Sequence, residues 1–434
     1  MSQKTLLGLI VIAILVIVAA IAIQHANQPL SDTAGQTQKL LPDLRAHVND
    51  IDKVVFTGAG SKTIATLTRG KDGWSVAEKG GYAADTGKLR EFLLKLSAAT
   101  VLEKKTSNKE KYADLGVQDV AADDAKGVLV EIDGVGQPTR LIIGSPDSSG
   151  RGTFVRRAGD AQSLLVSGRL SAGKDRNDWL RKDLADIAAK RIADVTIRHG
   201  DGHELHVHKN AEGDADFSLM DLPKGREIVS AFTVNGVAST LSGLRLDDVL
   251  PAKDAAPDDQ AIEARYATFD GLVVDVTAWS RDGKDYARFK ASLDREQADR
   301  HIAAGQADAK ARAEAGSAEN KEAAADTSPS KTQAGDETGA SADATAGTNA
   351  ATSKPLAVSD PARDRANKLA ALGKEVADLN ARFDGWTFVL PSYKYSSIDK
   401  SQDDLLKPLA GRNADKDKGK SAKKTAKKGG KAAR

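Results

Sequence analysis

The chain has 434 residues, a formal net charge of +2 and a composition in which 40% of residues are hydrophobic but only 4% are aromatic. The absence of cysteine excludes a disulfide framework, cysteine-ligated zinc or iron–sulfur sites, and a lipid-modified lipoprotein anchor. The length allows two or three domains, and the apolar content is sufficient for a hydrophobic core.

The N-terminal region contains an uninterrupted apolar run, residues 6–23, without a charged side chain. As a helix the run would span about 27 Å, close to the ~30 Å hydrocarbon core of a bilayer. A cleaved signal peptide is the alternative, but its apolar core is usually about 7–15 residues long, and the candidate cleavage site at residues 20–22 lies inside the run. We therefore predict one uncleaved transmembrane anchor.

The charges that flank this anchor predict its orientation. Lys4 and the amino terminus precede it, whereas residues 24–38 contain no Lys or Arg. Because positive charge favours the cytoplasmic side, residues 1–5 are expected in the cytoplasm and the bulk of the chain outside it. This predicts a single-pass protein of the bacterial inner (plasma) membrane, with residues 24–48 as a polar linker into the periplasm or extracytoplasmic space.

Residues 49–185 are predicted to form a first α+β unit. Asp85 is a good helix N-cap, and the apolar residues Leu89, Phe92, Leu93 and Leu96 that follow it lie on one helical face. Alternating apolar runs bounded by turn residues predict the strands of an antiparallel meander. These strands are expected at residues 53–56, 62–68, 74–77, 127–132, 139–143, 152–156 and 163–166.

The same order of elements recurs in residues 186–302, which predicts a second, tandem α+β unit. Residues 192–197 resemble residues 51–56, and Val237, Leu241 and Leu244 repeat the helical face of the first unit. Residues 179–190 are expected to join the units as a helix. Further strands are expected at residues 205–207, 264–269, 272–279 and 287–293.

Residues 303–357 interrupt the second unit with Ala, Glu, Asp, Lys, Ser, Thr and Gly and almost no large apolar residue. Such a segment cannot bury enough surface to offset its chain entropy, so we predict a disordered insertion, whose first part could form a transient helix. Residues 410–434 are Lys-rich and are predicted to be a disordered basic tail.

Residues 358–409 are predicted to complete the second unit with a helix and a strand at residues 386–390. Asp360 and Pro361 form an N-cap followed by proline at the first helical position. Apolar residues then recur at alternating steps of three and four, as in a heptad seam. The seam is either an internal packing face or a site for a partner helix. Its residues are Leu369, Leu372, Val376, Leu379 and Phe383.

Three stretches together resemble the DUF4340 family of bacterial envelope proteins. They are residues 74–85, with Trp74 and Asp85; residues 152–192, with the run Asp178-Trp-Leu-Arg-Lys-Asp-Leu184; and residues 385–406, with Gly385-Trp-Thr-Phe-Val-Leu-Pro391. The resemblance implies one N-terminal helix, a repeated extracytoplasmic region and an accessory role in ABC-type transport or gliding-motility-like systems. It implies no catalytic motif. The insertion and the lysine tail depart from the compact form of the family.

Four histidines, His199, His203, His206 and His208, are the clearest candidate ligands, because imidazole binds zinc, nickel or copper. The alternative is the polar outer face of a hairpin, which we favour because the spacing fixes no fourth ligand. The chain also lacks a phosphate loop and a Gly-x-Ser-x-Gly nucleophile elbow. We therefore assign no catalytic, cofactor-binding or metal-binding residue and expect no cofactor.

These observations predict a membrane-anchored extracytoplasmic accessory or scaffold protein rather than an enzyme. Its expected partners are inner-membrane protein subunits, with an ABC-type permease as a candidate. The basic tail is a candidate for contact with anionic lipid or polymer, whereas nucleic acid is disfavoured by the compartment. The alternative function is an extracytoplasmic protein that binds a small ligand or a metal.

Overall fold

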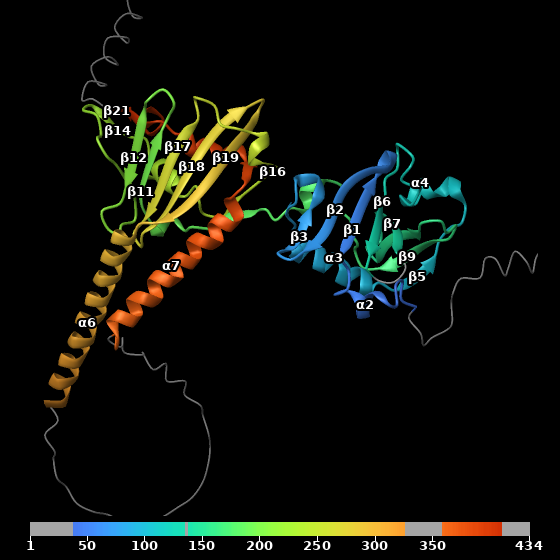
Figure 1. Cartoon of the computed structure of the whole chain (residues 1–434), viewed down its shortest axis with the longest axis horizontal. Coiled ribbons are helices and arrows are strands. Elements are labelled where there is room, and N and C mark those ends of the chain that lie inside the picture. Colours follow the sequence, from blue (N-terminus) through green and yellow to red (C-terminus); the bar gives the residue numbers. More distant parts are fainter. Residues whose placement is uncertain (1–37, 135–137, 326–357, 410–434) are drawn as a thin grey trace, which may run out of the picture. The chain divides into compact units, whose positions relative to one another are not determined.

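The structure, a computed structural model, describes residues 38–134, 138–325 and 358–409 (Figure 1). The chain divides into two compact units between Lys182 and Asp183, three residues from the predicted boundary. Within the described residues, no helix has the length and apolar character needed to cross a membrane. The predicted anchor, residues 6–23, lies outside the described residues, as does the basic tail.

Unit 1 contains a nine-stranded antiparallel sheet in the order β4-β3-β2-β1-β6-β7-β8-β9-β5. Helix α3 (Thr86–Ala98) begins at the predicted N-cap, where the Asp85 carboxylate accepts a hydrogen bond from the Lys88 amide at 2.8 Å. The short helices are α2 (Leu44–His47) and α4 (Tyr112–Leu115). The strands are β1 (Lys53–Gly58), β2 (Lys62–Gly70), β3 (Gly73–Val76), β4 (Tyr82–Ala83), β5 (Val101–Lys104), β6 (Val128–Asp133), β7 (Thr139–Pro146), β8 (Gly152–Arg157) and β9 (Ser163–Ser167).

The core of unit 1 confirms the predicted helical face and contradicts the predicted linker helix. Phe92 of α3 packs edge-on against Trp179, which stacks on Phe56 with 4.2 Å between ring centroids. Trp179 is fully buried, and the chain after it is extended, since Leu180 forms a bridge with Ala84. Residues 179–190 are therefore not a helix. They run through the end of the 3-10 helix η4 (Arg176–Trp179), strand β10 (Asp183–Ala185) and the start of the 3-10 helix η5 (Ala189–Arg191).

Unit 2 contains an eight-stranded sheet in the order β13-β12-β11-β17-β18-β19-β20-β16, and two-stranded ribbons β10-β15 and β14-β21. Its strands are β11 (Ile192–Arg198), β12 (Glu204–His208), β13 (Ser218–Leu219), β14 (Arg226–Ile228), β15 (Leu244–Arg245), β16 (Asp248–Pro251), β17 (Ile262–Thr268), β18 (Leu272–Arg281), β19 (Lys284–Leu293), β20 (Trp386–Val389) and β21 (Leu406–Pro408). Its helices are α5 (Ala231–Ala238), α6 (Arg295–Ala325), α7 (Pro361–Phe383), α8 (Ser392–Ile398) and α9 (Gln402–Leu405).

The two sheets share a repeated topology, as the sequence predicts. In unit 1, β1 pairs with β2 on one side and with β6 on the other. In unit 2, β11 pairs in the same way with β12 and β17. The helical repeat is only partial, because α5 ends at Ala238 and Leu244 lies in β15, although both predicted residues Leu241 and Leu244 are buried. The Lys394 ammonium donates to the carbonyls of Thr240 and Ser242 at 2.9 and 2.6 Å. These carbonyls therefore accept hydrogen bonds from a lysine side chain and not from the amides of a continuing helix.

Helix α7 begins at the predicted Asp360 N-cap and packs its seam into unit 2. Leu372, Leu379 and Phe383 are buried, and the Asn380 side-chain amide exchanges hydrogen bonds with both the N–H and the C=O of Ala291 in β19, each at 2.8 Å. The seam is thus an internal packing face and not a free site for a partner helix.

Helix α6 corrects the predicted start of the insertion at residue 303, because it continues to Ala325. Ile302 is buried, and Asp299 pairs with Arg365 of α7 at 2.7 Å. These contacts with α7 and the core stabilise the start of the helix (Figure 1). Residues 326–357 lie outside the described residues.

The buried seam yields a stability prediction. Leu372→Asp or Leu379→Asp should each lower the free energy of unfolding by at least about 3 kcal/mol, because each places an unpaired carboxylate in the core. Ala377→Asp is the control, since Ala377 is exposed on the same helix, and it should change stability by no more than about 0.5 kcal/mol. Urea denaturation measures both effects, and native-like stability of Leu379→Asp would contradict the packing described.

Candidate functional site

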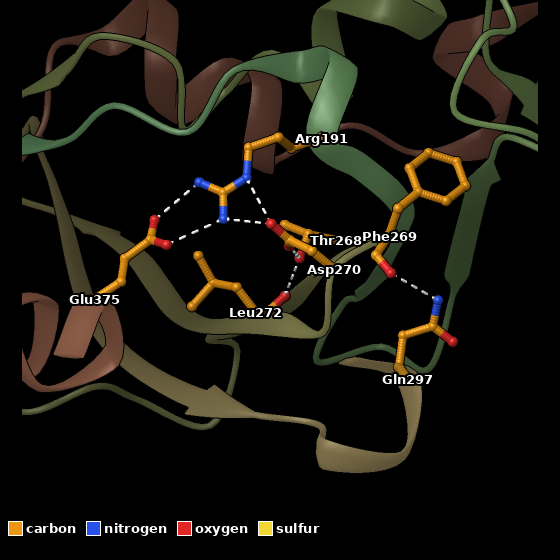
Figure 2. Close-up of polar contacts among 7 residues, drawn as sticks. All are labelled: Arg191, Thr268, Phe269, Asp270, Leu272, Gln297 and Glu375. Atoms are coloured by element: carbon orange, nitrogen blue, oxygen red, sulfur yellow. Dashed lines mark hydrogen bonds and ion pairs between the residues drawn. The ribbon is translucent and has the colours of Figure 1, made fainter. Parts of the chain in front are cut away.

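The best-formed polar cluster in unit 2 centres on Arg191, at the end of η5. Its guanidinium donates to Asp270 at 3.1 and 2.8 Å and to Glu375 at 2.9 and 3.1 Å (Figure 2). Hydrogen bonding to Glu375 is the main reason that the pKa of Arg191 lies well above its usual range, although partial burial opposes it. Asp270 follows β17 and Glu375 lies on α7, so the cluster connects the sheet to that helix.

The residues around Asp270 complete this cluster and leave it little capacity for a ligand. The Thr268 hydroxyl contacts the Asp270 carboxylate and the carbonyl of Leu272, and the Gln297 amide donates to the carbonyl of Phe269 at 2.9 Å (Figure 2). The carboxylates of Asp270 and Glu375 thus neutralise Arg191, a cation that belongs to the protein itself. We interpret the cluster as an ion-pair network that positions α7.

The four candidate histidines do not form a metal centre. The rings of His206 and His208 lie on one face of β12 with centroids 6.0 Å apart, but His206 contacts Asp194 and His203 pairs with Asp201 at 2.9 Å. His199 lies instead near Asp399, with 3.4 Å between Nε2 and Oδ1. Within the described ranges, no group of three or more His, Asp and Glu side chains is arranged to hold a metal ion.

A hollow of about 260 Å³ beside His199 contains several titratable groups. Tyr395 and Asp399 line it, and burial raises the pKa of Tyr395 to about 12. Ser280 also lines it, but its hydroxyl donates to the carbonyl of Lys284 at 3.4 Å rather than to an imidazole. The hollow could hold a small ligand, yet its hydrogen bonds do not form a nucleophile–base pair.

Exposed apolar side chains gather at one part of unit 2. Of the eight large apolar side chains that are exposed in the described residues, six come from segments 220–232 and 393–409. Phe232 is 86% exposed and Tyr393 is 68% exposed. We call these six residues the apolar cluster: Met220, Leu222, Val229, Phe232, Tyr393 and Leu409.

Backbone pairing brings the two segments of the apolar cluster together. β14 pairs with β21, the Val229 amide donates to the carbonyl of Leu405, and the Leu409 amide donates to the carbonyl of Gly225, each at 2.8 Å (Figure 1). Helix α5, which carries Phe232, contacts α8, which carries Tyr393. Monomeric proteins rarely expose large contiguous apolar patches, and the pairing of these segments makes the apolar cluster a candidate interaction surface.

A family model described as "Domain of unknown function (DUF4340)" matches residues 74–262, from β3 in unit 1 to the first residue of β17. Residues 74–262 belong to the DUF4340 family. This confirms the resemblance for two of its three stretches, whereas residues 385–406 lie beyond the DUF4340 match. No curated protein and no solved structure matches the chain significantly.

The DUF4340 match divides the apolar cluster. Met220, Leu222, Val229 and Phe232 lie within the DUF4340 domain, while Tyr393 and Leu409 come from the C-terminal segment that returns to pair with it. Sequence analysis did not find this surface, because exposure is not encoded in local apolar pattern. Phe232 occupies the second position of α5, after the N-cap Ser230 and Ala231, and this pattern does not distinguish an exposed phenylalanine from a buried one.

The Arg191 cluster yields a second stability prediction. Arg191→Met should lower the free energy of unfolding by about 1–3 kcal/mol, since two half-buried carboxylates lose their charged donor. Arg198→Met is the control, because its pair with Glu204 is largely exposed and should contribute about 0.5 kcal/mol or less. Urea denaturation compares the variants, and equal effects would show that the cluster does not position α7.

Proposed function

We propose that the chain is a membrane-anchored extracytoplasmic accessory or scaffold protein, an auxiliary subunit of an ABC-type transport or gliding-motility-like complex. It would be held at the bacterial inner membrane by residues 6–23, with its bulk outside the cytoplasm, and would act by binding rather than catalysis. The DUF4340 domain and the apolar N-terminal run support this proposal.

The apolar cluster is the observation that carries the proposal. Aromatic side chains dominate the energetics of protein interfaces, and Phe232 and Tyr393 are the most exposed large apolar residues of the cluster. Arg226 and Asp403, paired at 2.7 Å, supply a polar rim beside it. An apolar centre with a charged rim is the usual anatomy of a protein–protein interface.

The composition of the following segment favours a partner at the membrane. Residues 410–434 follow Leu409 directly and contain eight lysines and two arginines against two aspartates. Such a basic segment is attracted to an anionic bilayer surface. We therefore propose that the apolar cluster binds the extracytoplasmic part of an inner-membrane subunit. An ABC-type permease is the leading candidate for this subunit.

A small-ligand or metal-binding function is the second candidate. The hollow beside His199 favours it, because His199, Tyr395 and Asp399 place polar groups around a space of about 260 Å³. A small-ligand function predicts a ligand bound in this hollow, whereas the accessory function predicts a protein bound to the apolar cluster.

Substitution of the apolar cluster tests the proposed function. Phe232→Asp combined with Leu409→Asp should leave the fold intact, because both side chains are exposed. The substitutions should reduce co-purification with inner-membrane subunits by about tenfold or more, since truncating an interface hot spot costs about 2 kcal/mol. The measurement is quantitative mass spectrometry of the tagged full chain purified from membranes in mild detergent.

Leu94→Asp in α3 is the matched control, because Leu94 is an exposed apolar residue of unit 1 at 47% exposure. It should retain all partners. The proposed function would be wrong if Phe232→Asp/Leu409→Asp retained the same partners as the wild-type chain, or if the wild-type chain purified alone.

A further inference from the structure

Unit 1 contains a hollow of about 370 Å³ whose walls carry an excess of positive charge. Three segments separated in sequence form it: the β1–β2 turn, the residues that lead into β6, and the start of η4. Together they contribute four cationic side chains and one carboxylate. These are Lys62, Lys126, Lys174, Arg176 and Asp175.

The walls of this basic hollow are fixed by the fold. The β1–β2 turn is held by hydrogen bonds from the Gly60 and Ser61 amides to the loop before β6, at 3.1 and 2.9 Å. Gly127 has no room for a side chain, since a Cβ there would lie 2.3 Å from the Gly116 carbonyl oxygen. The Asp178 carboxylate accepts from the amides of Lys174 and Asp175 at 3.2 Å, which fixes the third wall.

The cations of the basic hollow have no acidic partners among the described residues. Some exposed cations of unit 1 pair with acids, as Arg140 does with Glu131 at 2.7 Å. No ion pair joins Lys62, Lys126, Lys174 or Arg176 to a described carboxylate, and the Asp175 carboxylate is engaged by the Asn177 amide at 2.7 Å. Four like charges around one hollow repel one another, and a bound anion would relieve this repulsion.

The donor set fits a phosphate group. Ammonium and guanidinium groups form charge-assisted hydrogen bonds with phosphate oxygens, and several cations around one space favour an anion that carries at least two charges. Thr63, which also lines the hollow, carries a hydroxyl that is a neutral donor. A volume of about 370 Å³ lies in the range of small-molecule sites.

We propose that the basic hollow of unit 1 is a binding site for a small phosphate-bearing ligand with two or more negative charges. This inference goes beyond the accessory function, because the hollow uses none of the residues of the apolar cluster. Its ligand could be a free phosphate compound or the headgroup of an anionic phospholipid, which share the same chemistry.

Titration of the full chain with inorganic pyrophosphate tests the site. The chain is held in nanodiscs of phosphatidylcholine at constant ionic strength, and binding is measured by isothermal titration calorimetry. The double variant Lys126→Gln/Lys174→Gln should weaken binding by about tenfold or more, because two of the four cations are removed. Its melting temperature without pyrophosphate should be unchanged, since both lysines are exposed.

The charge-matched control is Lys71→Gln/Lys104→Gln, which removes two exposed lysines of unit 1 that do not line the hollow. It should bind pyrophosphate within about twofold of the wild-type chain, since contacts at the site are kept. Nanodiscs that contain cardiolipin, whose headgroup carries two phosphates, should weaken pyrophosphate binding if the natural ligand is a headgroup, and leave it unchanged if the ligand is free. Absence of pyrophosphate binding to the wild-type chain, or equal losses in the two double variants, would overturn the proposal.

Discussion

The insertion of β20 into the second sheet is the interaction on which unit 2 depends. Residues 386–389 pair with β19 on one side and with β16 on the other, so this late segment closes a gap between strands formed earlier in the chain. Thr387 in β20 is fully buried, and its hydroxyl accepts from Arg288 at 2.9 Å. Without β20, both neighbouring strands would expose unpaired backbone groups, which is costly in a buried sheet.

The position of β20 also determines where the apolar cluster forms. α8, α9 and β21 follow it directly, and β21 can reach β14 only because β20 has returned the chain to the sheet. The Arg191 cluster restrains α7 just before this return. The apolar cluster is therefore a product of long-range strand pairing, and its two halves come from segments that are far apart in the sequence.

Local patterns predicted the elements of the fold well and its surfaces poorly. The Asp85 and Asp360 caps, the strand repeat and the seam of α7 follow from nearest-neighbour chemistry, and the structure confirms them. The predicted helix at residues 179–190 is wrong, because burial of Trp179 and pairing of β10 override helical propensity. The predicted disorder of residues 303–325 is also wrong, because contacts with α7 stabilise a polar helix there. The apolar cluster and the basic hollow each combine distant segments, so no local pattern could have indicated them.

We propose that a membrane protein covers the apolar cluster, and site-specific photocrosslinking in native membranes would detect it. A photoreactive amino acid replaces Phe232 in the full chain, and the same probe at Leu94 reports background contacts, because both positions are exposed. A discrete adduct with an inner-membrane protein is expected at Phe232 and none at Leu94. Absence of an adduct at Phe232, whether or not Leu94 yields one, would show that no membrane protein covers the apolar cluster.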